Sequence, residues 1–331
     1  MGNNIPRRHH YVPRLLLRNF TNSAGQLWVF DANQKKNWQA SPDSAGFERD
    51  LYARNLKSPE PEFSAIEEFL SQQVDGPGAE AIASLLARQR LSGEQEGNFL
   101  VFVAAQMLRT PAAFECLHAS EAPMFQEMFE RMANFDPEFR EGVSRRLLKS
   151  GASQQDIDRV FQSIRDGKSK VNPSRDFVLR GALRLVEPIA DELSKMRWAF
   201  LAVAKGEADL IIGDHPVLLT NPDSSRPFGL RTPTIELWMP LSRRMVACAR
   251  HDGPDSYGEL ARGMSDLINE RTLRHSRRFV FASAPSKQLR ADAIRLCGTG
   301  PKMHTRRIRI GDGLMIVNEF CYVDEDSCRS A

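Results

Sequence analysis

The sequence lacks the short motifs that identify the common nucleotide-dependent and hydrolytic enzymes. It has no Walker A motif, no G-x-G-x-x-G turn, no H-E-x-x-H pair and no G-x-S-x-G elbow. These absences remove the familiar P-loop, dinucleotide-binding, zinc-protease and serine-hydrolase signatures from consideration. Any chemistry must come from residues that the fold brings together from separate parts of the chain.

Cysteine, net charge and long apolar runs are also scarce. The five cysteines are odd in number and show no C-x-x-C spacing, which is atypical of a disulfide framework or a zinc ribbon and fits reduced thiols in the cytoplasm. The net charge of +3 does not by itself require a polyanionic partner. No segment approaches the roughly 18 uninterrupted apolar residues of a membrane span. We therefore expect a cytoplasmic protein without a membrane segment, in an oligomeric state that the sequence leaves open.

What the sequence does contain is the composition of a globular protein, with 41% hydrophobic and 26% charged residues. We expect a single large domain over residues 1–331, which is long for one core. The most loop-like segment, DGKSKVNPSRD at 166–176, permits a subdivision into residues 1–170 and 171–331. The first part would hold an N-terminal strand and helix region with a helical bundle, and the second an α+β region.

Apolar spacing predicts an α+β fold. Helices with a period near 3.6 are predicted at 62–74, 78–90, 92–109, 111–133, 137–150, 153–166 and 175–195, and two more at about 256–273 and 286–296. A short helix is predicted to start at Pro13, and SGEQ at 92–95 has the form of a capping box. Strands are predicted in a hairpin at 26–41, in six short runs between 198 and 283, and in a hairpin that turns at 311–313. We expect a predominantly helical N-terminal and central part, and a small mixed or antiparallel sheet built mainly from the C-terminal third.

The helix predicted at 92–109 carries polar side chains on an apolar face. Its members Phe99, Phe102, Gln106 and Arg109 are separated by three, four or seven residues, so they share one side of the helix. A buried polar group without a partner costs about 1–3 kcal/mol, so Gln106 and Arg109 need specific partners or a ligand. Arg109 is either an anion-binding residue or a helix-end arginine that reaches water past the last carbonyls.

The segment LIIGDHPVLLT at 210–220 displays an acid and a histidine at a turn. Gly213 frees the backbone and Pro216 restricts it, so Asp214 and His215 are presented at a defined position. An aspartate beside a histidine at a strand end suits metal ligation or acid–base work. The simpler interpretation, which these residues alone favour, is an Asx turn in which Asp214 bonds its own backbone.

The stretch RRHHYVPRLLLRNF at 7–20 combines basic and apolar residues near the N-terminus. Arg14 and Arg18 interrupt its apolar run, so it lacks the form of a secretory signal and we expect it to belong to the folded structure. In a helix that starts at Pro13, these arginines lie one turn apart, and His10 lies just before the helix N-terminus, where free N–H groups favour a phosphate or carboxylate. The alternative is an amphipathic surface helix with a solvated basic side, and it holds if both arginines face water.

Other charged residues are weaker candidates. Glu67 and Glu68 are interpreted as surface residues of the 62–74 helix. The C-terminal third is basic, with arginine clusters at 243–250, 271–278 and 304–310. Such clusters can follow a phosphate backbone, but they are usually solvated faces.

Six segments of the chain carry a family resemblance. They are HHYVPRLLLRNF at 9–20, ERDLYA at 48–53, AAQMLRTP at 104–111, GDHPV at 213–217, MPLSRR at 239–244 and LINERT at 267–272. In this order they resemble a bacterial HYVP-motif domain of unknown function (DUF4238-like), whose motifs read close to HYVPQFYLRNF, Q-x-x-R-[TS]-P and Ser-Asp-Asn-Pro. Arg14 and His215 stand where the family usually has Gln and Asn, so their roles are the least transferable. The family is uncharacterised, so the resemblance implies no particular reaction.

The resemblance and the physical argument single out the same polar residues. The resemblance nominates the matching positions His10, Tyr11, Pro13, Arg18, Asn19, Gln106, Arg109, Asp214 and Asn269. A histidine, an aspartate and two arginines are the inventory of phosphoester chemistry, although a buried structural network would use the same residue types. We hypothesise a phosphoester hydrolase, that is a nuclease or phosphodiesterase acting on nucleic acid or a nucleotide. The alternative is a non-catalytic nucleotide- or nucleic-acid-binding module; an NAD-consuming effector is a third possibility that no residue pattern supports.

The hypothesis gives each residue a role. His10 is the general acid or base, and Asp214 orients it or binds a divalent metal, Mg²⁺ or Mn²⁺, together with it. Arg109 stabilises the developing charge and clamps the phosphate with Arg18. The predicted substrate-binding residues are Tyr11, Arg18, Asn19, Gln106, His215 and Asn269.

Overall fold

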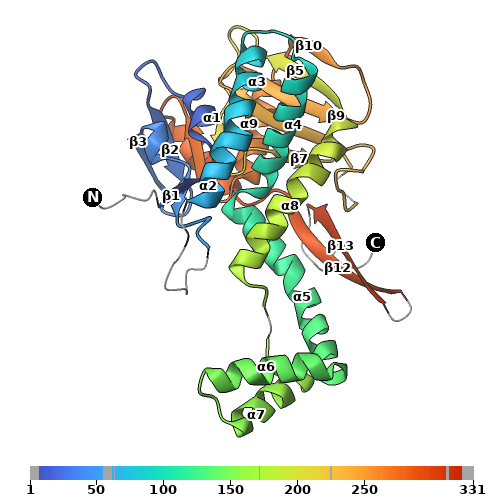
Figure 1. The fold of residues 1–331 in the computed structure, drawn as a ribbon. Helices are drawn as coiled ribbons and strands as arrows, with labels where there is room; N and C mark the ends of the chain where they lie inside the picture. The colour runs from blue at the N-terminus through green and yellow to red at the C-terminus, as the bar shows by residue number, and fades with distance from the viewer. Residues whose placement is uncertain are drawn as a thin grey trace.

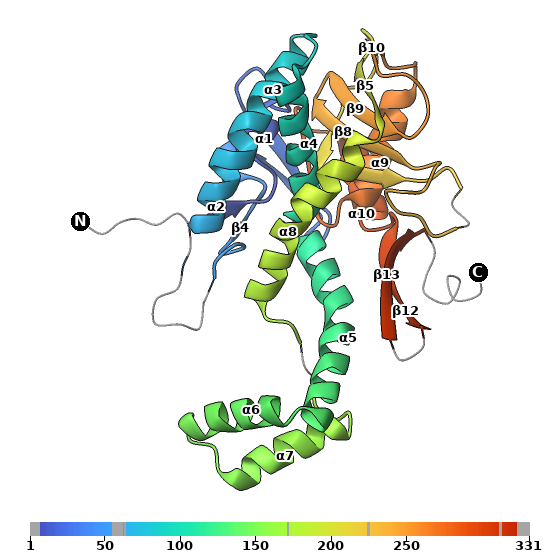
Figure 2. The same ribbon diagram turned by 45° about the vertical axis from the view of Figure 1, so that its right-hand side comes forward.

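The computed structural model describes residues 7–54, 62, 64–170, 172–223, 226–310 and 313–322. It is 46% helical and 21% strand, which confirms the predicted α+β class. Figure 1 shows a body in which helices lie over the strands, and an arm of three helices that projects from it. Figure 2 shows the arm and the C-terminal hairpin after the molecule is turned about the vertical axis.

The larger sheet has five strands in the order β10-β5-β9-β8-β7. Its pairs are antiparallel except β10–β5, which is parallel. One face of the sheet packs against helix α4 (Gly93–Leu108), where the ring centroid of Phe99 lies 5.2 Å from that of Trp198 and 5.5 Å from that of Phe200. The strands are β5 (Arg197–Ala202), β7 (Leu218–Thr220), β8 (Glu236–Ser242), β9 (Met245–Arg250) and β10 (Ser256–Glu259).

The start of the helix predicted at about 256–273 is wrong. Residues 256–259 form strand β10, and helix α9 begins only at Met264, after Gly263 with φ of +77°. Gly258 is a poor helix former, and an extended segment here pairs with the open edge of β5. The edge pairing overrides the local apolar spacing.

A second sheet joins an N-terminal hairpin to strands from the C-terminal half of the chain, in the order β3-β2-β11-β6. Its strands are β2 (Leu27–Asp31), β3 (Lys36–Ala40), β6 (Ile212–Gly213) and β11 (Phe279–Ala282). The expectation of a sheet drawn mainly from the C-terminal third is therefore inexact, because the predicted N-terminal hairpin pairs with β11. That pairing satisfies backbone groups that a two-stranded hairpin would leave at an open edge. Two smaller pairs are β1 (Arg8–His10) with β4 (Phe47–Arg49), and β12 (Lys302–Ile310) with β13 (Gly313–Cys321).

The helices follow the predicted positions closely. The capping box at Ser92 is confirmed, since its hydroxyl accepts from the N–H of Gln95 and the Gln95 side chain returns a bond to Ser92. The C-terminal hairpin is confirmed as well, although its turn at 311–312 lies outside the described residues. The helices are α1 (Arg14–Arg18), α2 (Ala65–Phe69), α3 (Gly76–Leu86), α4 (Gly93–Leu108), α5 (Pro111–Phe135), α6 (Pro137–Lys149), α7 (Gln154–Arg165), α8 (Arg175–Ser194), α9 (Met264–His275) and α10 (Lys287–Leu296).

A π-helical turn, η2 (Leu70–Asp75), joins α2 to α3. The predicted helices at 62–74 and 78–90 therefore form one continuous helical run. Pro77 has no N–H to donate, which disturbs the regular ladder at this point, and π turns of this kind often occur at functional sites. The turn ends on Asp75, a residue of the candidate site.

The main apolar core takes buried residues from both sides of the loop at 166–176. Leu16 and Phe99 from the N-terminal half share it with Trp198 and Leu237 from the C-terminal half. A separate small core in the arm contains Ala133, Ile157, Phe161 and Ile164. Of the described helices, none is by itself long and apolar enough to cross a membrane. Helices α4 and α5, which are bent by 69° relative to each other, reach the required length and apolar composition only when they are counted together.

Candidate functional site

Three of the segments that carry the family resemblance meet at Arg109. This residue follows α4, is 4% exposed, and donates from Nη1 to Asp75 Oδ1 at 2.6 Å and from Nη2 to the carbonyl of His10 at 2.7 Å. The Tyr52 hydroxyl donates to the carbonyl of Arg109 at 2.9 Å. The HYVP stretch, the ERDLYA segment and the Q-x-x-R segment are therefore held together by one buried hydrogen-bond network.

The environment of Arg109 keeps its guanidinium charged. Burial alone would lower its pKa, but the Asp75 carboxylate and Tyr52 outweigh burial and hold the pKa above its usual range. Nη1 and Nη2 are both occupied by protein acceptors, whereas Nε is buried without a partner among the described residues. In this conformation Arg109 therefore joins α4 to β1 and η2, and its Nε is the guanidinium nitrogen that makes no hydrogen bond to the described residues.

His10 is buried beside the same network. Its backbone N–H donates to Glu67 Oε1 at 3.3 Å. Its two ring nitrogens have no partner with hydrogen-bond geometry among the described residues, although the backbone of Asp43 lies close enough to act on the imidazole. Burial, followed by the positive charges of Arg14 and Arg109, lowers the pKa of His10 to about 4, and Asp43 opposes the shift. The imidazole is therefore neutral at pH 7 and has a free lone pair, as a general base requires.

The sequence-based interpretation of Glu67 as a surface residue is wrong. It is partly buried, its Oε2 has no partner among the described residues, and burial raises the pKa of its carboxyl group. The charges of Arg109 and Arg14 oppose that rise. A buried carboxyl that holds its proton more tightly than usual can act as a general acid.

Gln106 is the second polar residue that the sequence placed on the apolar face of α4. It is fully buried, and neither its amide oxygen nor its amide nitrogen has a partner among the described residues. It lies about one helical turn before Arg109, the C-cap residue of α4, so the two lie near one side of the helix end. We call His10, Glu67, Gln106 and Arg109 the His10 cluster.

The His10 cluster holds six buried polar atoms without partners: both ring nitrogens of His10, Oε2 of Glu67, both amide atoms of Gln106 and Nε of Arg109. Each such atom costs about 1–3 kcal/mol when it stays unpaired, and folded proteins carry few of them. A group of them on neighbouring elements therefore indicates a place that a polar ligand or ordered water occupies.

Asp214 holds a loop that lies far away in the sequence. Its carboxylate accepts hydrogen bonds from the backbone N–H groups of Arg277, Arg278 and Phe279, each at 2.8 Å. Burial raises the pKa of Asp214, and these N–H groups oppose the rise. The Asx-turn interpretation is thus right that Asp214 bonds backbone, its own N–H included, and the carboxylate also holds a loop more than sixty residues away in the sequence.

The carboxylate of Asp214 is occupied by backbone hydrogen bonds. Both oxygens of Asp214 are used by backbone N–H groups, and among the described residues no group of three or more His, Cys, Asp or Glu side chains is placed to hold a metal. The predicted Mg²⁺ or Mn²⁺ site at Asp214 and His10 stays a prediction, and no step is derived through it.

His215 and Tyr11 are two further predicted residues close to this part of the fold. The Nδ1 of His215 and the hydroxyl of Thr110 are 3.0 Å apart, which ties the GDHP turn to the residue after Arg109. Burial and then the neighbouring His275 lower the pKa of His215 to about 4. Tyr11 is buried, and burial followed by the charge of Asp214 raises the pKa of its phenol.

The remaining predicted residues of the opening stretch face outward or hold the backbone. Arg14 and Arg18 are both exposed on α1 and face water, with Arg14 ion-paired to the exposed Asp43 at 3.3 Å. This geometry favours the solvated basic face over a clamp formed by Arg18 and Arg109. Asn19 donates from its amide to the carbonyl of Leu241 at 2.9 Å, so it anchors α1 to the end of β8.

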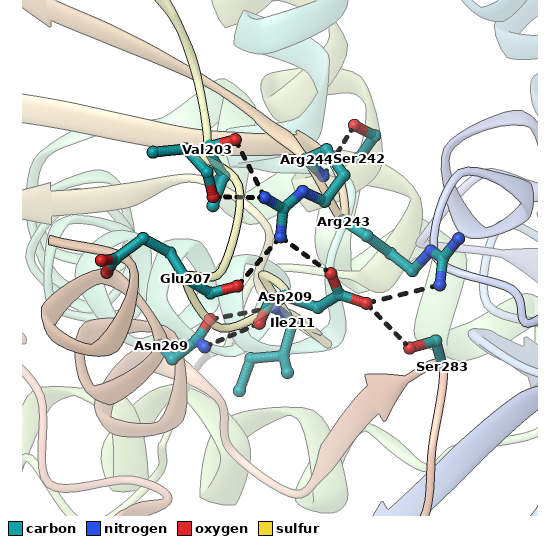
Figure 3. Close-up of polar contacts among 10 residues, drawn as sticks. Val203, Glu207, Asp209, Ile211, Ser242, Arg243, Arg244, Asn269 and Ser283 are labelled. Atoms are coloured by element: carbon teal, nitrogen blue, oxygen red, sulfur yellow. Dashed lines mark hydrogen bonds and ion pairs between the residues drawn. The ribbon is translucent and has the colours of Figure 1, made fainter. Parts of the chain in front are cut away.

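Asn269 belongs to a different network, shown in Figure 3. Its amide nitrogen donates to the carbonyl of Asp209 at 2.9 Å, and its oxygen accepts from the N–H of Ile211 at 3.0 Å. Arg243 and Arg244 both donate to the Asp209 carboxylate, at 3.3 and 3.2 Å. The MPLSRR and LINERT segments therefore meet at Asp209, where they hold the chain that leads to the GDHP turn.

Sequence reasoning missed three residues of the site. Tyr52 was available as a signal within the ERDLYA segment, but nothing in its spacing marked it as a hydrogen-bond donor to Arg109. Glu67 was dismissed because a glutamate on a helix is usually solvated. Asp75 precedes a Gly-Pro pair, and no local pattern indicates that it faces an arginine 34 residues later.

Comparison with known proteins identifies a family for this chain. No match was found among curated proteins or among solved structures. A family model described as a protein of unknown function (DUF4238) matches residues 8–286, which include every segment of the His10 cluster and the GDHP turn. The chain therefore belongs to the DUF4238 family, the proteins of unknown function that the opening stretch resembles.

Proposed function

We propose that the His10 cluster binds a phosphate ester of a nucleotide or nucleic acid and that the chain hydrolyses it. The observation that carries the proposal is the set of six buried, unpartnered polar atoms on His10, Glu67, Gln106 and Arg109. Unsatisfied groups of this kind are tolerated where function requires them, because a ligand then supplies the missing hydrogen bonds.

Charge favours an anionic ligand. Arg14 and Arg109 are the two cations that act on both His10 and Glu67. The unpartnered groups include donors on Gln106 and Arg109 and acceptors on Gln106 and Glu67. A phosphate oxygen can accept from the donors on Gln106 and Arg109, and a ribose hydroxyl can donate to the acceptors on Gln106 and Glu67. A nucleotide offers both kinds of group, so it suits this set of donors and acceptors better than a bare anion does.

The proposed reaction uses His10 and Glu67 as a proton-transferring pair. Neutral His10 takes a proton from water, the water oxygen bonds to phosphorus, and the bond from phosphorus to the leaving oxygen breaks. Glu67, in its protonated form, gives its proton to that leaving oxygen. Gln106 donates to a phosphate oxygen, and Arg109 keeps β1 and α4 at the required separation.

A substrate screen tests the proposal. Full-length protein is incubated with RNA, single-stranded DNA, dinucleotides and nucleotides, with Mg²⁺ or Mn²⁺ and with chelator. His10→Asn should lower turnover at least about 100-fold, as loss of a general base does, while His118→Asn, a histidine of α5 outside the cluster, should leave it unchanged. Turnover that survives His10→Asn would overturn the mechanism, and salt-sensitive binding without turnover would favour the binding module.

Gln106→Met separates a ligand site from a structural network. If Gln106 serves a ligand, the apolar replacement removes two unsatisfied polar atoms and should raise the free energy of unfolding by about 1–3 kcal/mol while abolishing turnover. If Gln106 is a structural residue with partners, the same change should destabilise the protein. Urea denaturation of wild type and variant distinguishes the two.

A further inference from the structure

The arm formed by α5, α6 and α7 exposes large apolar side chains. Both ribbon views show α5 leaving the body and carrying α6 and α7 at its far end (Figures 1 and 2). Along α5, Met124 is 43% exposed, Met128 42% and Phe135 83%. A contiguous apolar surface that faces water indicates an interaction site.

These residues form one seam along α5. Positions 124, 128, 131 and 135 follow a 4-3-4 spacing, which keeps them within an arc of about 60° on the helix. Another side of α5 holds the arm together: the ring centroids of Phe125 and Phe177 are 4.6 Å apart, and Phe129 packs against Phe139 at 5.4 Å. The seam of Met124, Met128, Arg131 and Phe135 is not used by those contacts.

We propose that this seam pairs with the seam of a second copy of the chain, antiparallel, about a twofold axis between residues 129 and 130. In this register, Met124 of one copy lies opposite Phe135 of the other, and Met128 lies opposite Arg131. The 4-3-4 spacing is that of coiled-coil core positions, and the paired segment spans about 16 Å of each helix.

Charge complementarity identifies the occupant as a second copy. Arg131 lies within the seam, is 56% exposed, and is ion-paired with Glu127 of its own helix at 3.1 Å. In the antiparallel register the Arg131 stem covers Met128 of the other copy, and its guanidinium reaches that copy's Glu127. Each copy supplies both the cation and the anion, as a twofold interface requires. The inference does not depend on the activity proposed above.

Sedimentation equilibrium of the full-length protein over a concentration series tests the pairing. Wild type should sediment as a dimer, and Met128→Arg should raise the dimer dissociation constant at least about tenfold because it places a charge in the centre of the seam. Leu267→Arg, at a comparably exposed leucine of α9, should leave the constant unchanged. A wild type that stays monomeric would overturn the proposal, as would a dimer that Met128→Arg does not weaken.

Crosslinking tests the register. In the double variant Met124→Cys, Phe135→Cys, the two thiols of one helix are about 16 Å apart and cannot bond, whereas each faces a thiol of the other copy. Mild oxidation should therefore give a covalent dimer with the double variant, at a yield far above that of either single variant or of wild type. Equal yields in all four proteins would refute the antiparallel register.

Discussion

Replacement of Arg109 by alanine distinguishes a structural arginine from an anion clamp. The structure gives Arg109 three acceptor contacts: both oxygens of Asp75, at 2.6 and 3.3 Å, and the carbonyl of His10, at 2.7 Å. Truncation leaves a mostly buried carboxylate without its counter-ion. Breaking a buried ion pair from one side costs about 3–5 kcal/mol, a large share of the roughly 5–15 kcal/mol that stabilises a typical domain.

The expected loss can be expressed as a melting temperature. An unfolding entropy of about 2.1 cal/mol/K per residue gives about 0.7 kcal/mol/K for 331 residues, so 3–5 kcal/mol corresponds to a fall of about 4–7 °C. Differential scanning calorimetry of Arg109→Ala measures it. Arg145→Ala breaks the Glu141–Arg145 pair, whose side chains are both mostly exposed, and should shift the melt by less than about 1 °C.

The variant Asp75→Ala tests whether the stability lost in Arg109→Ala comes from the ion pair with Asp75. Because Arg109 and Asp75 share one contact, the costs of Arg109→Ala and Asp75→Ala should be strongly non-additive in a double-mutant cycle. The reasoning fails if Arg109→Ala melts within about 1 °C of wild type and loses only stabilisation by a phosphate-bearing ligand. That result would restore the clamp interpretation drawn from the sequence.

Two further predictions concern the GDHP turn. The pKa of His215 is lowered to about 4 in the folded protein, whereas a histidine in the unfolded chain has a pKa near 6.5. Between these two pH values the unfolded state therefore binds more protons than the folded state. The free energy of unfolding falls as the pH drops through this range. His215→Asn should reduce this pH dependence by up to about 1.4 kcal/mol per pH unit in urea denaturation, and an unchanged slope would contradict the assignment. Asp214→Ala leaves three backbone N–H groups without their acceptor and should lower the free energy of unfolding by about 3 kcal/mol or more in the same assay. Asp214→Asn should be less severe, because its amide oxygen still accepts a hydrogen bond. If Asp214→Ala is as stable as wild type, the loop does not need this carboxylate.

The sequence by itself determined the helices because their signals are local. The capping box at Ser92, the 3.6-residue apolar spacing and the helix-starting prolines at 111 and 137 all act within a few residues, so α4, α5 and α6 lie where they were predicted. The same spacing correctly indicated that Gln106 and Arg109 enter an apolar interior, although it could not say what they meet there.

Tertiary structure alone decided which partners those residues have and which strands pair. Asp75 lies 34 residues before Arg109 and Glu67 lies 57 residues after His10, so no local pattern connects them, and the same holds for Asp214 and the loop at 277–279. Likewise, β2 pairs with β11 across some 250 residues, and β10 forms because the edge of β5 is open. Burial and hydrogen-bond satisfaction are properties of the whole packed chain, so residues of ordinary local character, Glu67 among them, become part of the site only when the chain folds around them.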